Sequence, residues 1–213
     1  LAVGLGAMQL LLDRGQGEDW FQSTEIIIEA GVMVAMLWMA AIHFVTAKNP
    51  LFHRELFADR NLVVAGFLMT IIGMTIMTPM ALLPPMLQNL FGYPVIDTGM
   101  VLAPRGVGTF VTMAVAGAAM GRIDTRYMVA LGILMASYSM YLMAHWNLDV
   151  SAQQVMWTGF LQGLGMGLVF MPVNALAFAT LDPRLRTDGS SLMNLLRSIG
   201  GSIGISVATT LLA

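Results

Sequence analysis

The sequence contains no cysteine and few charged residues. Among its 213 residues, only 10% are Asp, Glu, Lys or Arg, whereas a typical soluble domain carries about 25%. The absence of cysteine excludes disulfides and thiolate metal sites, and it leaves the redox compartment unspecified. The formal net charge of −2 is too small to indicate binding of nucleic acid or another polyanion.

The sequence is rich in apolar residues. Hydrophobic residues make up 57% of the chain, and its mean hydropathy is +0.77. A soluble protein of this length could not bury so much apolar surface in a single core. We therefore predict an all-α fold, a polytopic bundle of transmembrane helices. Leu1 and Ala213 both lie within apolar runs, so we expect a fragment cut inside two spans.

Apolar runs of about 20 residues, the length that crosses the hydrocarbon core, divide the chain. We expect one partial span at the start and six nearly whole spans after it. Their ranges are 1–12 for the partial span and 25–47, 62–83, 99–120, 127–144, 155–179 and 190–213 for the others. We expect Pro84 and Pro85 to interrupt the second whole span and Pro104 the third. Asp97 and Thr98 are expected to cap that third helix.

Basic residues are concentrated in every second loop. The positive-inside rule places loops rich in Lys and Arg in the cytoplasm. The basic loops are 48–61, 121–126 and 180–188, which together hold Lys48, Arg54, Arg60, Arg122, Arg126, Arg184 and Arg186. The alternate loops hold only Arg14 and are predicted to lie outside; they are 13–24, 92–98 and 145–154.

Arg197 lies inside the last apolar run. An arginine near hydrocarbon costs roughly 2.5–3.5 kcal/mol on insertion scales, so it normally faces a bundle interior or a wet cavity. Helical spacing places Arg197 on one stripe with Asn194, Gly201, Gly204 and Ala208. Two interpretations stay open: close helix packing beside a snorkelling arginine, or an arginine on a transport pathway.

Arg105 lies about one to two turns into its span, directly after Pro104. Thr109 and Thr112 follow at helical spacing, so all three polar residues share one face. The side chain of Arg105 either reaches outer-leaflet headgroups or lies on a transport pathway. Its depth in the membrane decides between the two interpretations.

Besides Asn194, three neutral amide side chains are candidate site residues. Gln88 lies in the continuation of a span at 86–91, after Pro84 and Pro85, and Gln162 and Asn174 lie within the span 155–179. Interhelical hydrogen bonds of such groups contribute about 0.6 kcal/mol on average, so a structural role is the more common explanation. Contact with a substrate is the alternative. Gln162 and Asn174 are about 120° apart on an ideal helix, so they need not serve one site.

Prolines within or at the end of spans are candidate hinges, because interrupted membrane helices line cavities or bend during transport. The helix-breaking residues in question are Pro84, Pro85, Pro104 and Pro172. Proline is also common in membrane helices that have no such role. The glycine sets at 163–167 and 200–204 permit close approach of helix backbones, and nothing around them fits a nucleotide-binding loop.

No acidic residue lies in the middle of a predicted span, and Glu29 comes closest, about one turn inside its outer end. A proton-driven carrier needs a titratable group with alternating access, so we expect the main proton carrier outside this sequence. The histidines show no ligand spacing, so neither a metal nor another cofactor is expected. The spans contain no histidine–carboxylate set, so a membrane-embedded enzyme is a remote alternative. A membrane scaffold is another remote alternative.

Four strings of the sequence together resemble the drug:proton antiporters with fourteen spans of the major facilitator superfamily, the EmrB type. The strings are LLDRGQGEDWFQSTEI, LPPMLQNLFGYPVIDTGMVLAPRGVG, FLQGLGMGLVFMPVNALAFATL and SSLMNLLRSIGGSIGIS. The resemblance implies that residues 1–47 are an extra helix pair between two six-helix halves, the first helix being partial. Residues 48–61 are then a cytoplasmic connector, and residues 62–213 are core helices seven to eleven of a truncated C-terminal transport bundle.

The resemblance also implies a function. Members of this family export apolar drugs across the inner (cytoplasmic) membrane of bacteria in exchange for protons, by alternating access; export of a metabolite, siderophore or lipid stays open. Many members in Gram-negative bacteria work with a periplasmic adaptor protein and an outer-membrane channel. The family's loop motif between core helices eight and nine is shortened here and implies a gating role for Gly121, Arg122, Asp124 and Arg126.

Overall fold

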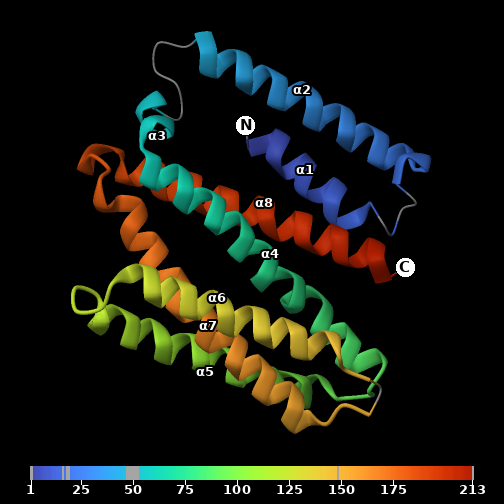
Figure 1. Cartoon of the computed structure of the whole chain (residues 1–213). Coiled ribbons are helices and arrows are strands. Elements are labelled where there is room, and N and C mark those ends of the chain that lie inside the picture. The colour runs from blue at the N-terminus through green and yellow to red at the C-terminus, as the bar shows by residue number, and fades with distance from the viewer. Residues whose placement is uncertain (1, 16, 18–19, 47–52, 148, 213) are drawn as a thin grey trace. The chain divides into compact units, whose positions relative to one another are not determined.

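All regular structure in the described residues is helical (Figure 1). The computed structural model describes residues 2–15, 17, 20–46, 53–147 and 149–212. The helices are α1 (Ala2–Arg14), η1 (Trp20–Gln22), α2 (Thr24–Thr46), α3 (Arg54–Ala58), α4 (Arg60–Asn89), α5 (Val95–Ala119), α6 (Thr125–Ala144), α7 (Ala152–Ala179), η2 (Pro183–Leu185) and α8 (Arg186–Leu212). The prediction of an all-α bundle is confirmed.

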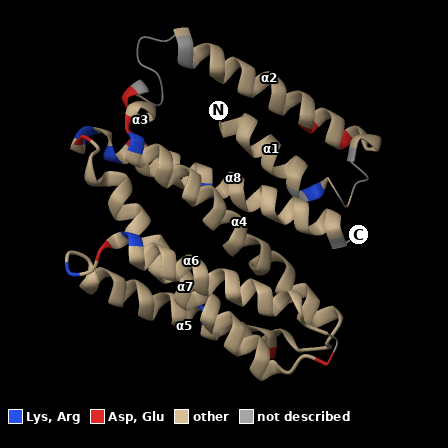
Figure 2. Ribbon diagram, in the orientation of Figure 1, with Lys and Arg blue, Asp and Glu red and all other residues tan. Residues whose placement is uncertain are grey.

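Five of these helices, α2, α4, α5, α6 and α7, are long and apolar enough to cross a membrane. The helix α8 is 27 residues long, which suffices for a bilayer. It is not among the five, so a span there stays a prediction. Charged residues lie mostly in loops and at helix ends (Figure 2), as lipid around the helix middles requires.

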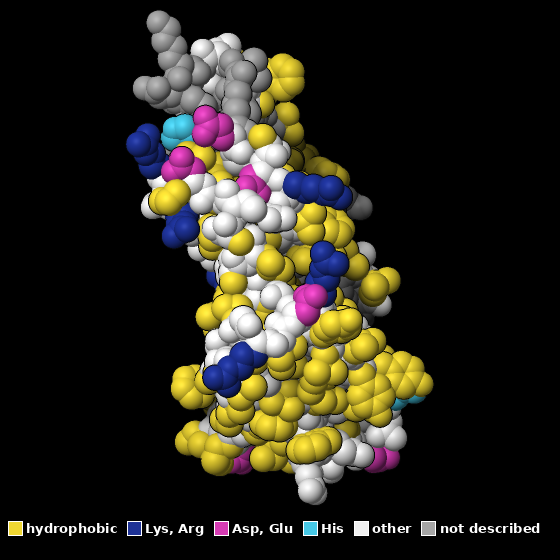
Figure 3. Space-filling model, turned by 60° about the vertical axis from the view of Figure 1, so that its left-hand side comes forward, with side chains coloured by type: hydrophobic (Ala, Val, Ile, Leu, Met, Phe, Trp, Pro, Cys, Tyr) yellow, Lys and Arg dark blue, Asp and Glu magenta, His cyan; other side chains and the backbone are white. Residues whose placement is uncertain are grey.

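Large apolar side chains are exposed along the helices. Hydrophobic side chains cover much of the face shown in Figure 3. Trp38 on α2 and Phe110 on α5 are 69% and 76% exposed. Monomeric soluble proteins rarely expose contiguous apolar patches larger than a few hundred Å². This surface is suited to contact with lipid.

The chain forms two compact units. The first comprises residues 1–79 and 177–213, and the second comprises residues 80–176. The first unit therefore contains α1, α2, α3, most of α4, and α8. The second contains the end of α4, all of α5 and α6, and most of α7. The predicted division at residues 47 and 61 stays a prediction.

In the first unit, glycines let helix backbones touch. The helix α1 packs on α2 and also contacts α8. Gly73 on α4 lies against the carbonyl of Arg197 on α8, and Gly200 on α8 lies against the carbonyl of Thr70 on α4. A side chain at either glycine would clash with backbone atoms of the other helix. The glycines of the 200–204 set thus have the packing role that their spacing predicted.

In the second unit, α7 packs closely on both α5 and α6. A Cβ atom on Gly108 of α5 would lie 2.6 Å from the carbonyl oxygen of Phe160, and one on Gly165 would lie 2.6 Å from that of Gly132 on α6. The buried hydroxyl of Ser139 on α6 donates a 2.7 Å hydrogen bond to the carbonyl of Thr158 on α7. These contacts hold α7 between its two neighbours.

The predicted interruptions of the helices are wrong. The helix α4 runs without a break through Pro79, Pro84 and Pro85, α5 runs through Pro104, and α7 runs through Pro172. Each proline removes one backbone hydrogen bond. A broken helix in hydrocarbon would leave several backbone groups without partners, each at a cost of several kcal/mol, so the chain stays helical. A hinge role for these prolines stays a prediction.

Two helices, α5 and α8, begin four residues before their predicted starts. The helix α5 begins at Val95 after the capping residue Pro94, so Asp97 and Thr98 lie inside its first turn. The hydroxyl of Thr98 donates back to the carbonyl of Pro94 at 3.0 Å. The carboxylate of Asp97 lies near the positive end of the helix dipole. It therefore stabilises the helix electrostatically, without acting as the N-cap. The helix α8 begins at Arg186, before the predicted residue 190.

Candidate functional site

Arg105 is the most enclosed cation of the second unit. It lies on α5 against α7, where a Cβ on Gly159 would be 3.8 Å from the Cβ of Arg105 and Gly163 meets its carbonyl. The Nε and Nη2 atoms of its guanidinium are buried and make no hydrogen bond to any residue that the structure describes. A snorkelling arginine would hold these nitrogens in water or among headgroups. The buried nitrogens favour an interior position for Arg105.

The two threonines that share the face of Arg105 are already bonded within their own helix. Thr109 donates from Oγ1 to the carbonyl of Arg105 at 3.0 Å, and Thr112 donates to the carbonyl of Gly108 at 2.8 Å. A hydroxyl hydrogen used in this way cannot also bind a ligand. The hydroxyl oxygens keep their acceptor lone pairs, which are suited to a donor rather than to an anion.

The three amides occupy different depths. Gln162 on α7 is 1% exposed, and Asn174 donates from Nδ2 to the carbonyl of Phe170 at 2.8 Å. Gln88 is half-buried near the end of α4. Twelve residues of helix separate Gln162 from Asn174, a rise of about 18 Å. Gln162 neighbours Gly163 and so lies near the level of Arg105, whereas Asn174 belongs to another level.

Asn194 and Arg197 are joined in the first unit. Arg197 donates from Nη2 to the Oδ1 of Asn194 at 3.1 Å, within α8. Asn194 is exposed and Arg197 is half-buried. The shared stripe predicted for these two residues is therefore present, and the amide orients the guanidinium.

The loop motif forms the turn between α5 and α6. Gly121 has a φ of +89°, which side chains disfavour, and its neighbours Arg122, Asp124 and Arg126 are exposed. The Oδ1 of Asp124 accepts a 3.0 Å hydrogen bond from the backbone N–H of Arg126 and so caps α6. The motif thus has a local structural role, and a gating role stays a prediction.

A polar network at the predicted cytoplasmic side escaped the sequence analysis. Thr180 donates to the Oδ2 of Asp59 at 2.7 Å, and Asn61 donates to Thr180 at 3.2 Å. These hydrogen bonds hold the pKa of Asp59 below its usual value of 3.8, led by the bond from Thr180 and then by the backbone N–H of Leu62. His53 and Asp188 approach to 2.9 Å in the same unit. Partners more than 100 residues apart leave no pattern in a sequence.

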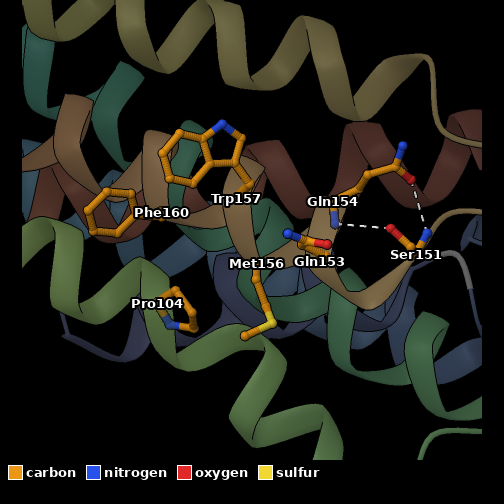
Figure 4. A pocket seen from close by; sticks show the side chains of 7 residues that line it. All are labelled: Pro104, Ser151, Gln153, Gln154, Met156, Trp157 and Phe160. Carbon is orange, nitrogen blue, oxygen red and sulfur yellow. Dashed lines mark hydrogen bonds between the residues drawn. The ribbon is translucent and has the colours of Figure 1, made fainter.

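The second unit also contains a pocket of about 820 Å³ that the sequence did not predict. The pocket lies between Pro104 on α5 and the first three turns of α7 (Figure 4). Trp157 and Phe160 line it, side by side, with ring centroids 5.8 Å apart. An aromatic pair one turn apart on a helix was the only available signal, and it is also typical of an ordinary membrane-facing surface.

Comparison with known proteins gives the family. Residues 2–205 match the pattern of the Major Facilitator Superfamily. The chain is 31% identical over 214 residues to the multidrug export protein EmrB of Escherichia coli, covering 99% of this chain and 41% of that protein. It is 31% identical over 211 residues to the fatty acid resistance protein FarB of Neisseria gonorrhoeae, covering 99% of this chain and 42% of that protein.

A third relative is the probable multidrug resistance protein EmrY of E. coli, 30% identical over 216 residues and covered to 41%. The chain thus spans about two-fifths of the length of these relatives. The match of 2–205 accounts for nearly every described helix, including the five that suit a bilayer. The chain is a multi-pass membrane protein that belongs to the major facilitator superfamily and is similar to its EmrB-type members.

Proposed function

We propose that this chain is part of an inner-membrane secondary transporter that exports apolar drugs by proton antiport through alternating access. Its family and the names of its relatives support the class of function. The structural observation that carries a polar pathway is Arg105, whose Nε and Nη2 atoms are buried without a hydrogen bond from the described part of the chain. We assign the chain no catalytic role.

The energetics of Arg105 explain why it belongs to a pathway. A buried donor without a partner costs about 1–3 kcal/mol, and more when it is charged. A static structural arginine would be expected to have its donors satisfied. An acceptor that arrives during the transport cycle, from a substrate or from another part of the protein, removes this cost. Arg105 is therefore a group whose partner changes.

The other polar residues within the helices contribute to the pathway or its gates. Gln162 is buried and precedes Gly163, the glycine that packs against the carbonyl of Arg105. Arg197 with Asn194 forms a polar pair in the first unit. Gln88 and Asn174 are proposed contacts at other depths. The prolines Pro84, Pro85, Pro104 and Pro172 supply weak points where otherwise continuous helices bend.

A second candidate substrate class is an amphipathic carboxylic acid. Two arginines, Arg105 and Arg197, lie within long helices, and cations are suited to a carboxylate. One relative is named for fatty acid resistance. Export of a lipid-like acid thus stands beside export of uncharged drugs. We also propose that the basic loops face the cytoplasm, and that a periplasmic adaptor and an outer-membrane channel are partners.

The test uses the complete protein in bacterial cells that are loaded with a fluorescent apolar dye. We expect Arg105→Ala and Arg197→Ala each to lower the efflux rate at unchanged membrane abundance. Arg184→Ala is the matched control, because Arg184 is an exposed arginine in η2. An uncoupler should stop efflux by the wild-type protein. Wild-type efflux from both arginine variants would remove these residues from the mechanism, and efflux that survives the uncoupler would refute proton antiport.

A further inference from the structure

The pocket between α5 and α7 has the dimensions of a small-molecule site. Its volume of about 820 Å³ falls within the range of roughly 300–1,000 Å³ that is typical of such sites. Pro104 forms its wall on α5, and Met156 reaches from α7 toward that wall (Figure 4). The flexible thioether of methionine adapts to ligands of different outline.

Two aromatic rings give the pocket a preference for flat molecules. The rings of Trp157 and Phe160 are stacked at an interplanar angle of 25°. Trp157 is 65% exposed, so part of its ring is open to a ligand. Offset stacking on such a ring strengthens binding about two- to tenfold beyond the effect of the buried area. An aromatic ligand therefore gains more here than an aliphatic one of equal size.

The polar side of the pocket is neutral and rigid. Ser151 and Gln154 bond reciprocally at the start of α7, with distances of 3.0 and 3.3 Å between backbone nitrogens and side-chain oxygens. This capping box holds both side chains in place. Gln153 adds an exposed amide with both donors and an acceptor. The lining contains no charged residue, so an ion would be desolvated here without compensation.

We propose that this pocket binds flat, uncharged aromatic molecules of drug size. The first turns of α5 and α7 follow loops that are predicted to lie outside, so the site is at the outer side of the membrane. In an export cycle it is where a substrate pauses before release, and this role rests on the proposed function. Binding itself does not depend on transport.

The test measures protection of an introduced thiol in the complete protein, with any cysteines beyond this chain removed. Gln153→Cys places a thiol at the pocket, and Asp149→Cys places the control thiol in the preceding exposed loop. A membrane-impermeant maleimide labels both, without a proton gradient, with and without the uncharged probe N-phenyl-1-naphthylamine. At about ten times its dissociation constant, the probe should slow labelling of Gln153→Cys about tenfold and leave Asp149→Cys unchanged.

Variants of the aromatic pair sharpen the test. Trp157→Ala should lower the affinity for the probe about tenfold, since an interaction of this size is lost. Phe160→Leu keeps most of the volume, so it reports on the ring if Trp157→Ala does not fold. Equal labelling with and without the probe would overturn the proposal. So would an unreactive Gln153→Cys beside a reactive Asp149→Cys, because another segment or lipid would then cover the pocket.

The outcome for the pocket is separable from that for transport. Normal dye efflux without protection of Gln153→Cys overturns the pocket alone. Protection without efflux overturns the proposed function and leaves the binding site in place.

Discussion

Gly73 on α4 lies so close to the backbone carbonyl of Arg197 on α8 that no Cβ atom fits at residue 73. The arginine that the sequence marks as unusual is therefore held at its backbone by a glycine 124 positions earlier in the chain. The position of the Arg197 side chain depends on this contact between two helices.

Gly73→Ala is expected to destabilise the first unit. The new methyl group meets backbone atoms of α8, which cannot move aside as a side chain can, and such overpacking costs about 1–3 kcal/mol. The midpoint of heat denaturation of the detergent-solubilised complete protein measures the effect. Gly31→Ala on α2 is the control, because a Cβ atom there meets nothing within 4 Å. An unchanged midpoint for Gly73→Ala would refute the close contact.

Ser139→Ala should weaken the contact between α6 and α7 by a smaller amount. The buried hydroxyl of Ser139 donates to the carbonyl of Thr158 at 2.7 Å, and interhelical bonds in membranes average about 0.6 kcal/mol with a maximum near 1.7. The same heat-denaturation measurement applies. Ser137→Ala is the matched control, because Ser137 is an exposed serine of the same helix. Equal midpoints for the two variants would show that this hydrogen bond contributes nothing.

Arg14→Ala is expected to loosen the pairing of α1 and α2. Arg14 lies 3.0 Å from the Oε2 of Glu25 and 3.7 Å from the Oε1 of Glu29. Glu29 is the more enclosed carboxylate, with a side chain 16% exposed against 63% for Glu25. Loss of the cation leaves that enclosed charge uncompensated, at about 1–3 kcal/mol.

The control for this prediction is the double variant Arg14→Ala with Glu29→Gln. Removing the carboxylate charge should restore most of the heat stability that Arg14→Ala loses. Glu25→Gln alone should change little, because exposed ion pairs contribute about 0–1 kcal/mol. If the double variant is as unstable as Arg14→Ala, the loss comes from packing of the arginine stem instead.

Thr180→Val should alter the acid stability of the first unit. The variant removes the hydroxyl that lowers the pKa of Asp59, so that pKa moves back toward 3.8. A carboxyl with a lowered pKa stabilises the folded state above its unfolded pKa, and this contribution is lost as the pH falls through the folded pKa. The wild-type protein should therefore exceed the variant in heat stability at neutral pH, and the difference should shrink below pH 3.8.

The comparison needs a threonine variant without a carboxylate partner. Thr210→Val serves, because the hydroxyl of Thr210 donates to the carbonyl of Ser206 in its own helix at 2.8 Å. Its heat-stability difference from wild type should not depend on pH between about 3 and 7. A pH-independent difference for Thr180→Val as well would contradict the role assigned to Asp59.

Composition and local spacing were enough to predict the membrane class, the all-α fold and the approximate helices. Runs of about 20 apolar residues must be helices in lipid, because no other local structure satisfies the backbone there. The shared face of Asn194 and Arg197 also followed from spacing, and the structure joins the two side chains by a hydrogen bond. Such features depend on residues within a few turns of one another.

The predictions that rested on single prolines were wrong, because the continuity of a membrane helix depends on the whole span. Pro84 and Pro104 are strong helix breakers in water, yet α4 and α5 continue through them. The cost of an open backbone in hydrocarbon exceeds the hydrogen bond that each proline removes. The start of α5 was also misplaced, because the helix begins at Val95, directly after Pro94, and not after Asp97 and Thr98.

Only the tertiary structure shows which residues come together in the candidate sites. The burial of the Arg105 nitrogens depends on how α7 lies against α5, and the pocket beside Trp157 depends on the space left between these two helices. The bond from Thr180 to Asp59 joins residues 121 positions apart. A sequence specifies which face of a helix is polar or small, through a period of 3.6 residues, but which helix meets that face is settled by packing of the whole unit.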